Sequence, residues 1–435
     1  MFTKNKTLLF LGAAIMAAAL TVSAVSASVN SDPTKLVIHG STTLGPVIDY
    51  VTATFNSAGQ GVTIDTTNFV QNSSGAGIGD LNAAPTQLAD IAMSSRALKS
   101  TESAVDTATI AGVDAVVIMV NDAHTPTDVT TLTKQQIRGI YENVYALTAA
   151  GGDGTHEYWD AGAVTVPAPG IVGDDGVPYD SGVAFPALPG HGISGDHVQI
   201  VVYARNLDSG TRGFLGDSIA HGGCVFATPQ VTSADPVSVT NVYANYYPLE
   251  EQLMGITDAN RFGSAQLMED NISTSTAAAI GYAGVGYDTE AHIRKINVID
   301  DISGSDRTAY AATPINIYSN HYHLSRYLYL VTKNGDSNLT NDNKFVQWFE
   351  TLDSPGQDAL TQKHELRIVP DQDINNTGTI GSADLTQLGV DYGKSDPSLT
   401  GTTHLRSDID RVGSVGSAAL TDLGYWYGVT VQALP

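Results

Sequence analysis

The sequence predicts a mixed α/β fold with a mainly parallel sheet, followed by a small all-α module. Strand and helix patterns alternate between residues 35 and 91, which is typical of α/β layers. Two later segments are apolar without interruption, as strands covered on both faces are. A short unit that occurs twice after Pro370 predicts the helical module. With 435 residues, 42% of them apolar, the chain can build two or three domains.

The alternating region starts with a short apolar strand at residues 36–38 (LVI). Residues 44–55 follow with apolar side chains at helical spacing, and residues 62–64 (VTI) are rich in β-branched side chains. This order of elements predicts that consecutive strands lie parallel, with the helix packed on the sheet.

The two uninterrupted apolar strands are residues 113–120 (VDAVVIMV) and 199–203 (QIVVY). Between them lies a stretch rich in Gly, Pro and Asp that has no helical or alternating pattern, and we interpret residues 143–196 as a long surface insertion. Further elements are predicted as strands at 278–287 and 328–331 and a helix at 341–352.

The first residues are typical of a secretory signal peptide. Lys4 and Lys6 precede an apolar run that ends in small residues, so residues 1–27 are predicted to be removed on export. The run is short for a membrane-spanning helix, which remains an alternative. We therefore expect a secreted protein, extracellular or associated with the cell surface. Cys224 is the one cysteine, so neither an internal disulfide nor a lipid anchor at the cleavage site is expected.

Acidic residues outnumber basic residues by 45 to 21, which gives a net charge of −24. Such a charge repels nucleic acid and anionic membranes, and a nucleic-acid partner is excluded. Histidine and serine residues do not form a nucleophile elbow or a zinc-protease motif, so no catalytic residue is assigned and the chain is predicted not to be an enzyme. An anion receptor with this charge needs strong local donors.

Three segments place hydroxyl residues and glycine directly before a helical pattern: residues 40–43 (GSTT), 72–77 (NSSGAG) and 208–211 (DSGT). A helix N-terminus exposes unpaired N–H groups and partial positive charge, so it can hold an oxyanion without lysine. Each segment alone is more simply explained as an ordinary N-cap. Together with Arg205, whose guanidinium offers a planar fork of donors, they predict an oxyanion site.

These segments also resemble those of a known family. The stretches IHGSTTLGPVIDY, SSGAGI, RNLDSGTRGF, IGYAGVGY and SRYLYLVTK occur in the order found in periplasmic phosphate-binding proteins of ABC transporters. The resemblance covers residues 35–370, and its most diagnostic piece is Arg205 followed by Ser209-Gly210-Thr211.

The resemblance implies a two-lobed periplasmic-binding-protein fold of type II that closes over an anion. Lobe one would consist of residues 32–118 and 275–370, and lobe two of residues 119–274. The ligand-binding residues implied are Thr42, Thr43, Ser73, Ser74, Arg205, Ser209, Gly210 and Thr211. The expected function is binding of phosphate or a similar oxyanion for delivery to an ABC permease.

The sequence departs from the family pattern at one position. Many relatives have an aspartate after the serine of the segment that begins Asp-Ile, where it accepts the proton of hydrogen phosphate, but this chain has Ser95 there. Ser95 is expected to donate to the ligand. A carboxylate acceptor is what would reject fully ionised sulfate, so the sequence leaves phosphate and sulfate open.

The C-terminal unit repeats at a spacing of 35 residues, and 12 of the 21 positions from 373–393 match those of 408–428. The first copy has the ligand spacing of a calcium loop: Asp373, Asn375, Thr377, Thr379 by its carbonyl, and Asp384 at position 12. The second copy keeps Asp408 and Asp410 but has Ala419 at position 12, so a weak site is expected there. A helical hairpin without metal is the alternative for both copies.

The duplicated unit resembles a dockerin domain, which spans residues 371–435 here. The resemblance implies calcium as a cofactor and a cohesin-bearing scaffold or surface protein as a partner, with Tyr392, Trp426 and Tyr427 as candidate contacts. The module would then tether the receptor near its transporter. An alternative function is a surface or matrix protein that uses the binding-protein fold as an adhesive or structural block.

Overall fold

The computed structural model describes most of the chain in eleven segments. They are residues 32–142, 144–153, 156–165, 171–172, 178–179, 184–206, 208–219, 260–287, 290–302, 307–396 and 404–432. The predicted signal peptide lies outside these residues, as do Cys224 and parts of the predicted insertion. No helix within the described segments is long and apolar enough to cross a membrane.

The first elements alternate between strand and helix, as the sequence predicts. Helix α1 runs from Gly45 to Ser57 because Val47, Ile48, Val51 and Phe55 share one face, which is buried. The other elements of this part are β1 Lys35–Leu36, β2 Ile38–Gly40, β3 Thr63–Ile64, β4 Val70–Gln71, α2 Ser74–Leu81, β5 Ile91–Ser94 and α3 Ser100–Ser103.

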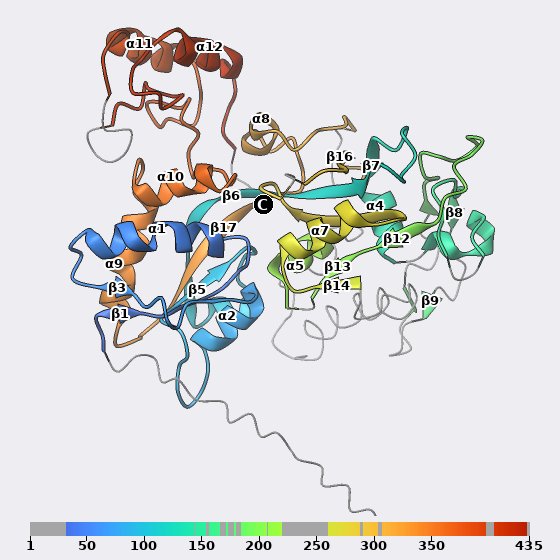
Figure 1. Cartoon of the computed structure of the whole chain (residues 1–435), viewed down its shortest axis with the longest axis horizontal. Coiled ribbons are helices and arrows are strands. Elements are labelled where there is room, and N and C mark those ends of the chain that lie inside the picture. The colour runs from blue at the N-terminus through green and yellow to red at the C-terminus, as the bar shows by residue number, and fades with distance from the viewer. Residues whose placement is uncertain are drawn as a thin grey trace, which may run out of the picture.

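Strand β6, Asp106–Asn121, is 16 residues long and connects two groups of elements (Figure 1). Its first part, up to Ala115, pairs with β17, whereas Val116–Val120 pair with β15 and Ile118–Asn121 with β16. The sheet therefore runs without a break in the order β12-β15-β6-β17-β5-β2-β4. The apolar run that predicts a strand at 113–120 lies mostly in the second half of β6.

The second group of elements contains the predicted insertion. Its elements are β7 Thr131–Thr133, α4 Lys134–Tyr141, the 3-10 helices η1 Val144–Ala146 and η2 Thr148–Ala150, β8 Val164–Thr165, β9 Ile171–Val172, β10 Pro178–Tyr179, β11 Ala184–Phe185, β12 Ile200–Val202, β13 Ala204–Arg205, α5 Gly210–Ile219, β14 Arg261–Phe262, α7 Ala265–Thr274, β15 Ala278–Gly284, β16 Ile293–Ile299 and α8 Pro314–Tyr318. The insertion supplies part of the core, because Trp159, Phe185 and Leu188 are buried.

The chain then returns to the first group through β17 Ser325–Lys333, α9 Leu339–Glu350 and α10 Pro355–Gln362. We call the described elements β1–β5, α1–α3, the first part of β6, β17, α9 and α10 the first lobe, and the elements from the second part of β6 to α8 the second lobe. Figure 1 shows these two lobes side by side. Strand β15 pairs with β12 and β6, and β16 pairs with β6 and β7, whereas β17 pairs with both β6 and β5.

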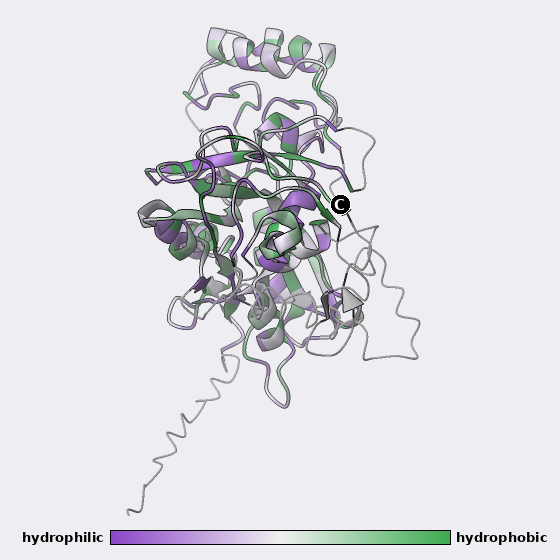
Figure 2. Cartoon of the chain, turned by 90° about the vertical axis from the view of Figure 1, so that its right-hand side faces the viewer, coloured by the Kyte–Doolittle hydropathy of each residue, from purple (hydrophilic) through white to green (hydrophobic). Residues whose placement is uncertain are grey.

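The C-terminal module consists of two loop-helix units, with helices α11 Ser382–Asp391 and α12 Ser417–Trp426 (Figure 1). Hydrophobic and hydrophilic residues alternate along these helices, which form one end of the molecule (Figure 2). Ile374, Ile380, Leu423 and Trp426 of the module belong to the same buried apolar cluster as the core of the second lobe. The ring of Trp426 lies 5.9 Å from that of Tyr318 in α8. The module therefore packs against the lobes.

Candidate functional site

The three predicted helix starts are observed, and they meet where the two lobes face each other. Thr42 and Thr43 lie in the turn before α1, Ser73 caps α2, and Ser209 directly precedes α5. The cap of α2 forms because the Ser73 hydroxyl accepts from the backbone N–H of Ala76 at 3.0 Å.

Contacts between α2 and the segment before α5 join the lobes. The Ser73 hydroxyl donates to Oδ2 of Asp208 at 2.7 Å, and the N–H of Gly75 donates to the Asp208 carbonyl at 3.2 Å. The absence of a side chain at Gly75 permits this approach, because a Cβ there would lie only 3.1 Å from the Asp208 carbonyl oxygen. The described lobes are thus in direct contact.

Ser74, Ser95 and Gly210 form the tightest part of the site. The hydroxyl oxygens of Ser74 and Ser95 are 3.2 Å apart, and the Ser95 N–H donates to the Ser74 hydroxyl at 3.0 Å. A Cβ at Gly210 would lie 2.2 Å from the Ser74 hydroxyl oxygen and 2.7 Å from that of Ser95. Position 210 therefore requires glycine in this closed arrangement.

Arg205 is the predicted cation of the site, and its side chain is held from three directions. Nε donates to the Phe262 carbonyl at 3.1 Å, and Nη2 donates at 3.1 Å both to the Gly263 carbonyl and to the Thr42 hydroxyl. Arg205 is 2% exposed, and its Nη1 has no hydrogen-bond partner among the described residues. Burial lowers the pKa of Arg205 to about 10, so the group remains a cation at neutral pH.

Thr211 contacts a second buried guanidinium, that of Arg326, which the sequence does not predict as a site residue. Arg326 of β17 donates from Nη2 to the Thr211 hydroxyl at 3.1 Å, and from Nε to Asp114 Oδ2 at 2.8 Å. Its Nη1 also has no hydrogen-bond partner in the described parts of the chain. The charge of Arg326 lies close enough to Arg205 to act against its protonation. A charged residue inside the apolar segment SRYLYLVTK is the sequence signal that points to this role.

The carboxyl groups near these arginines do not balance them. Asp114 is fully buried and paired with Arg326. Burial, together with the charge of Asp114, raises the pKa of Glu365 well above its usual value. Among the described residues, Arg205 forms no salt bridge with a carboxylate, which favours an anion beside its guanidinium.

A pocket of about 530 Å³ adjoins the site on the side of Thr42. Thr42 and Thr43 of the first lobe and Ser264 and Gln266 of the second line it, together with Tyr287, whose hydroxyl donates to the Thr42 carbonyl at 2.9 Å. Because residues of both lobes form its wall, its shape depends on how the lobes are placed.

The predicted calcium ligands of the first loop lie together in the module. The Asp373 carboxylate accepts from the N–H groups of Thr377 and Gly378 at 2.9 and 2.8 Å, and the Asp384 carboxylate from those of Asn375 and Gly381 at 3.1 and 2.8 Å. Each of the four carboxylate oxygens keeps a lone pair for a cation. The chain makes a sharp turn at Gly378, where φ is +79°, as the predicted calcium loop requires, and calcium binding stays a prediction.

The second loop has the same turn but a different set of side chains. Gly413 has φ of +87°, and its N–H donates to Asp408 Oδ2 at 2.9 Å. Ala419 is buried at position 12. Burial and the nearby Asp410 raise the pKa of Asp408, opposed by the hydrogen bond from Gly413. Of the predicted aromatic contacts, Trp426 is buried, whereas Tyr392 and Tyr427 are exposed.

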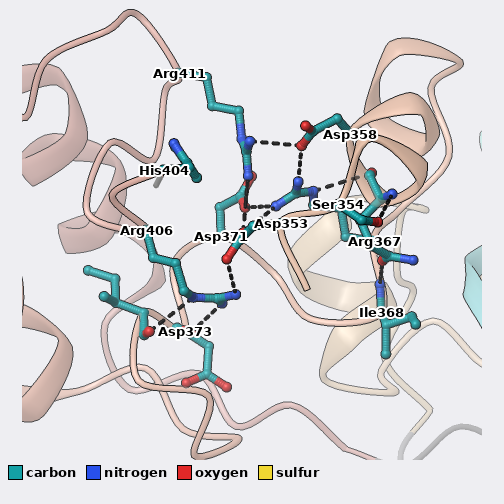
Figure 3. A network of polar contacts seen from close by, with 12 residues as sticks. Asp353, Ser354, Asp358, Arg367, Ile368, Asp371, Asp373, His404, Arg406 and Arg411 are labelled. Atoms are coloured by element: carbon teal, nitrogen blue, oxygen red, sulfur yellow. Dashed lines mark hydrogen bonds and ion pairs between the residues drawn. The ribbon is translucent and has the colours of Figure 1, made fainter. Parts of the chain in front are cut away.

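A salt-bridge network connects the module with the first lobe (Figure 3). Arg411 of the second loop pairs with Asp353, Asp358 and Asp371, and Arg367 pairs with the same three carboxylates. Sequence analysis does not predict this network, because its members lie in four separate segments.

A comparison with protein-family models finds one match over most of the chain. The model described as a PBP superfamily domain matches residues 27–351. A search of curated proteins finds no match.

Solved structures with low sequence identity also match. One is described as a phosphate ABC transporter substrate-binding protein from Clostridium perfringens with bound phosphate; it is 20% identical, with a TM-score of 0.48 over 77% of this chain and 100% of that one. An ABC-type phosphate transport receptor from Vibrio cholerae is 18% identical, with a TM-score of 0.44 over 76% of this chain and 99% of that one.

Proposed function

Because the chain belongs to the PBP superfamily, we propose that it binds a tetrahedral oxyanion, phosphate first of all, between its two lobes. The superfamily membership confirms the predicted α/β binding-protein fold, and it agrees with the prediction that the chain is not an enzyme. The ligand and the residues that hold it are part of the proposal.

The observation that carries the proposal is the unpartnered Nη1 of Arg205. Leaving a buried guanidinium donor without an acceptor is costly, and the described neighbours do not provide one. An oxyanion would accept from this atom and offset the positive charge of Arg205, which has no salt-bridge partner among the described residues. The hydroxyls of Thr42, Ser74 and Thr211 come from three helix starts and that of Ser95 from the end of β5, and all four are suited to the remaining oxygen atoms.

Closure of the lobes is a second part of the proposal. The contacts of Asp208 with Ser73 and Gly75 bring α2 against the start of α5, so that both helix ends border the same small space. A ligand enclosed in this way loses its water, and its affinity depends on how completely these donors replace that water.

Titration calorimetry of the purified chain with phosphate, sulfate, molybdate and tungstate tests the proposal. Arg205→Ala is expected to weaken binding by about 2–5 kcal/mol, because a charge-assisted contact inside a closed site is lost. Arg307→Ala, a change at an exposed position, is the control. The proposal is rejected if Arg205→Ala binds phosphate within a factor of two of the wild type. Thermal melting shows whether the variant is folded.

We further propose that the bound anion passes to an ABC permease and that the C-terminal module tethers the protein. The first loop would hold calcium through Asp373, Asn375, Thr377, Thr379 and Asp384. The outer faces of α11 and α12 expose Leu385, Val390, Leu420 and Tyr425, which are apolar side chains that a cohesin-type partner could cover.

The same exposed helices favour a second candidate function, that of a surface or matrix protein in which the module does the binding. The calorimetric experiment separates the two. Absence of heat with all four oxyanions, from a folded chain whose module binds calcium, would favour the surface protein.

A further inference from the structure

The second loop of the module lacks the closing carboxylate of a calcium loop, yet it contains acidic oxygens without donors. Asp408 is fully buried, and its Oδ1 has no hydrogen-bond partner among the described residues; the same is true of Asp410 Oδ1. Two carboxylate oxygens cannot satisfy one another unless a proton or a cation lies between them. The loop is therefore short of positive charge.

The backbone shows how a further carboxylate reaches this loop. In the module, each loop pairs with the segment that follows the helix of the other copy: Thr379 bridges to Thr430, and Ser395 bridges to Ser414. The N–H of Val431 donates to the Gly378 carbonyl at 2.9 Å, and the N–H of Asp396 donates to the Gly413 carbonyl at 2.7 Å.

Asp396 and Val431 are equivalent positions of the repeat, 35 residues apart. Where the first loop receives an aliphatic side chain, the second loop receives a carboxylate. The second loop thus lacks a carboxylate at position 12, where Ala419 stands, but it receives the carboxylate of Asp396 from the segment that follows α11.

His404 completes the cluster. Its side chain is 1% exposed, and its Nδ1 lies 2.6 Å from Asp396 Oδ2, yet this nitrogen has no partner with hydrogen-bond geometry among the described residues. One ligand atom each from Asp396, His404 and Asp408 lie within 4.8 Å of one another, and all three residues are buried. A nitrogen and an oxygen that are close but not aligned for a hydrogen bond are suited to a shared cation.

The arginines near this cluster are turned away from it. Figure 3 shows Arg411 directed at Asp358 and Asp371, although it lies beside His404. Arg406 donates to the backbone carbonyls of Asp373 and Ile374 at 2.8 and 3.0 Å. Neither guanidinium is thus directed at the oxygens of Asp408.

We propose that the second loop binds a divalent transition metal such as Zn²⁺ through His404, Asp396 and Asp408. Calcium prefers six to eight oxygen ligands, whereas an imidazole nitrogen with two carboxylates is a donor set for zinc and its neighbours. Ligand atoms of a tetrahedral zinc site lie about 3.3 Å apart, within the spread of this cluster. Asp410 and water are available for a fourth position. This site is independent of the proposed oxyanion function.

The metal would fasten residues 393–396 to the second loop. The two loops of the module then differ in their cation, calcium in the first and a transition metal in the second. Each cation would bind the folded state only, and it would thereby stabilise the pairing of one loop with the segment that follows the helix of the other copy.

The test is a titration of the whole chain with ZnCl₂ in the presence of saturating CaCl₂. We expect one site per chain whose affinity falls at least tenfold in His404→Gln and in Asp396→Asn. His124→Gln, which changes an exposed histidine after β6, is the matched control and should leave this site intact.

Co²⁺ gives a second readout, because a tetrahedral nitrogen and oxygen site produces a visible absorption band that should disappear in His404→Gln. Calcium binding by the first loop shows that each variant has a folded module. The proposal is overturned if the wild type has no such site, if His404→Gln keeps it, or if Ca²⁺ competes equally with Zn²⁺ for it.

Discussion

Nη1 of Arg411 lies 2.8 Å from Oδ1 of Asp358, and this ion pair joins the second loop of the module to helix α10 of the first lobe (Figure 3). Asp371 is 3.0 Å from the same guanidinium, and Arg367 pairs with both carboxylates. A network of partly buried charges with several partners restrains two parts of a protein more than isolated surface pairs do. The module is therefore expected to keep a fixed position on the first lobe.

Arg411→Ala should loosen the module without unfolding the lobes, because three carboxylates lose one of their cations. We expect faster hydrogen exchange in α11 and α12, corresponding to a loss of about 1–3 kcal/mol in local stability. Hydrogen exchange with mass spectrometry measures this directly. Lys394→Ala, which removes an ion pair internal to the module, is the control. Equal effects of the two variants would mean that the network does not hold the module.

Gly210→Ala should prevent full closure of the lobes, because the new Cβ would lie 2.2 Å from the Ser74 hydroxyl oxygen. The expected result is an oxyanion affinity at least tenfold weaker, together with a larger radius of gyration in small-angle scattering with phosphate present.

Gly213→Ala is the matched control for this change. A Cβ at position 213 has Arg96 Cδ as its nearest neighbour, at 3.6 Å, which is an ordinary contact. An unchanged affinity in Gly210→Ala, or the same loss in both variants, would show that closure does not bring Ser74 and Gly210 together.

Ser95→Asp should shift the preference of the site from sulfate towards hydrogen phosphate. The new carboxylate can accept the proton of hydrogen phosphate, but it repels sulfate, which has no proton to share. Competition calorimetry at pH 7 should show that the affinity for sulfate falls by a factor at least ten times larger than the affinity for phosphate. If both ligands lose affinity equally, Ser95 does not face the ligand.

Asp384→Asn should abolish calcium binding by the first loop, because calcium affinity follows the number of charged ligands. Without calcium the wild-type module should lose helix content, and the variant should show this loss even when calcium is present. Circular dichroism during a calcium titration measures the effect. Asp408→Asn should leave the calcium-dependent gain of helix in place, because Asp408 belongs to the second loop. Loss of this gain in Asp408→Asn would contradict the assignment of calcium to the first loop.

The sequence predicts the local elements well because their signals are local. Apolar spacing in residues 44–55 and the cap at Ser73 depend only on neighbours in the chain, and helix α1 begins within a residue of the expected position. The helix predicted at 341–352 is shifted by two residues, to Leu339–Glu350.

Features that depend on tertiary contacts could not be read in the same way. Arg326 stands in an apolar strand, and only the pairing of β17 with β6 places it beside Asp114 and Thr211. Asp396 and His404 lie outside the repeat motif, so no spacing rule connects them with Asp408.

The crossed pairing of the module makes its two repeats one folding unit. The first loop is completed by residues 428–431, about 50 positions further along the chain, and the second by residues 393–396, which precede it. A single repeat would lack the segment of the other copy that pairs with its loop. The loop would then lose conformational entropy on folding without gaining these backbone hydrogen bonds. Both copies are therefore needed for the module to fold, and one repeat alone is not expected to be stable.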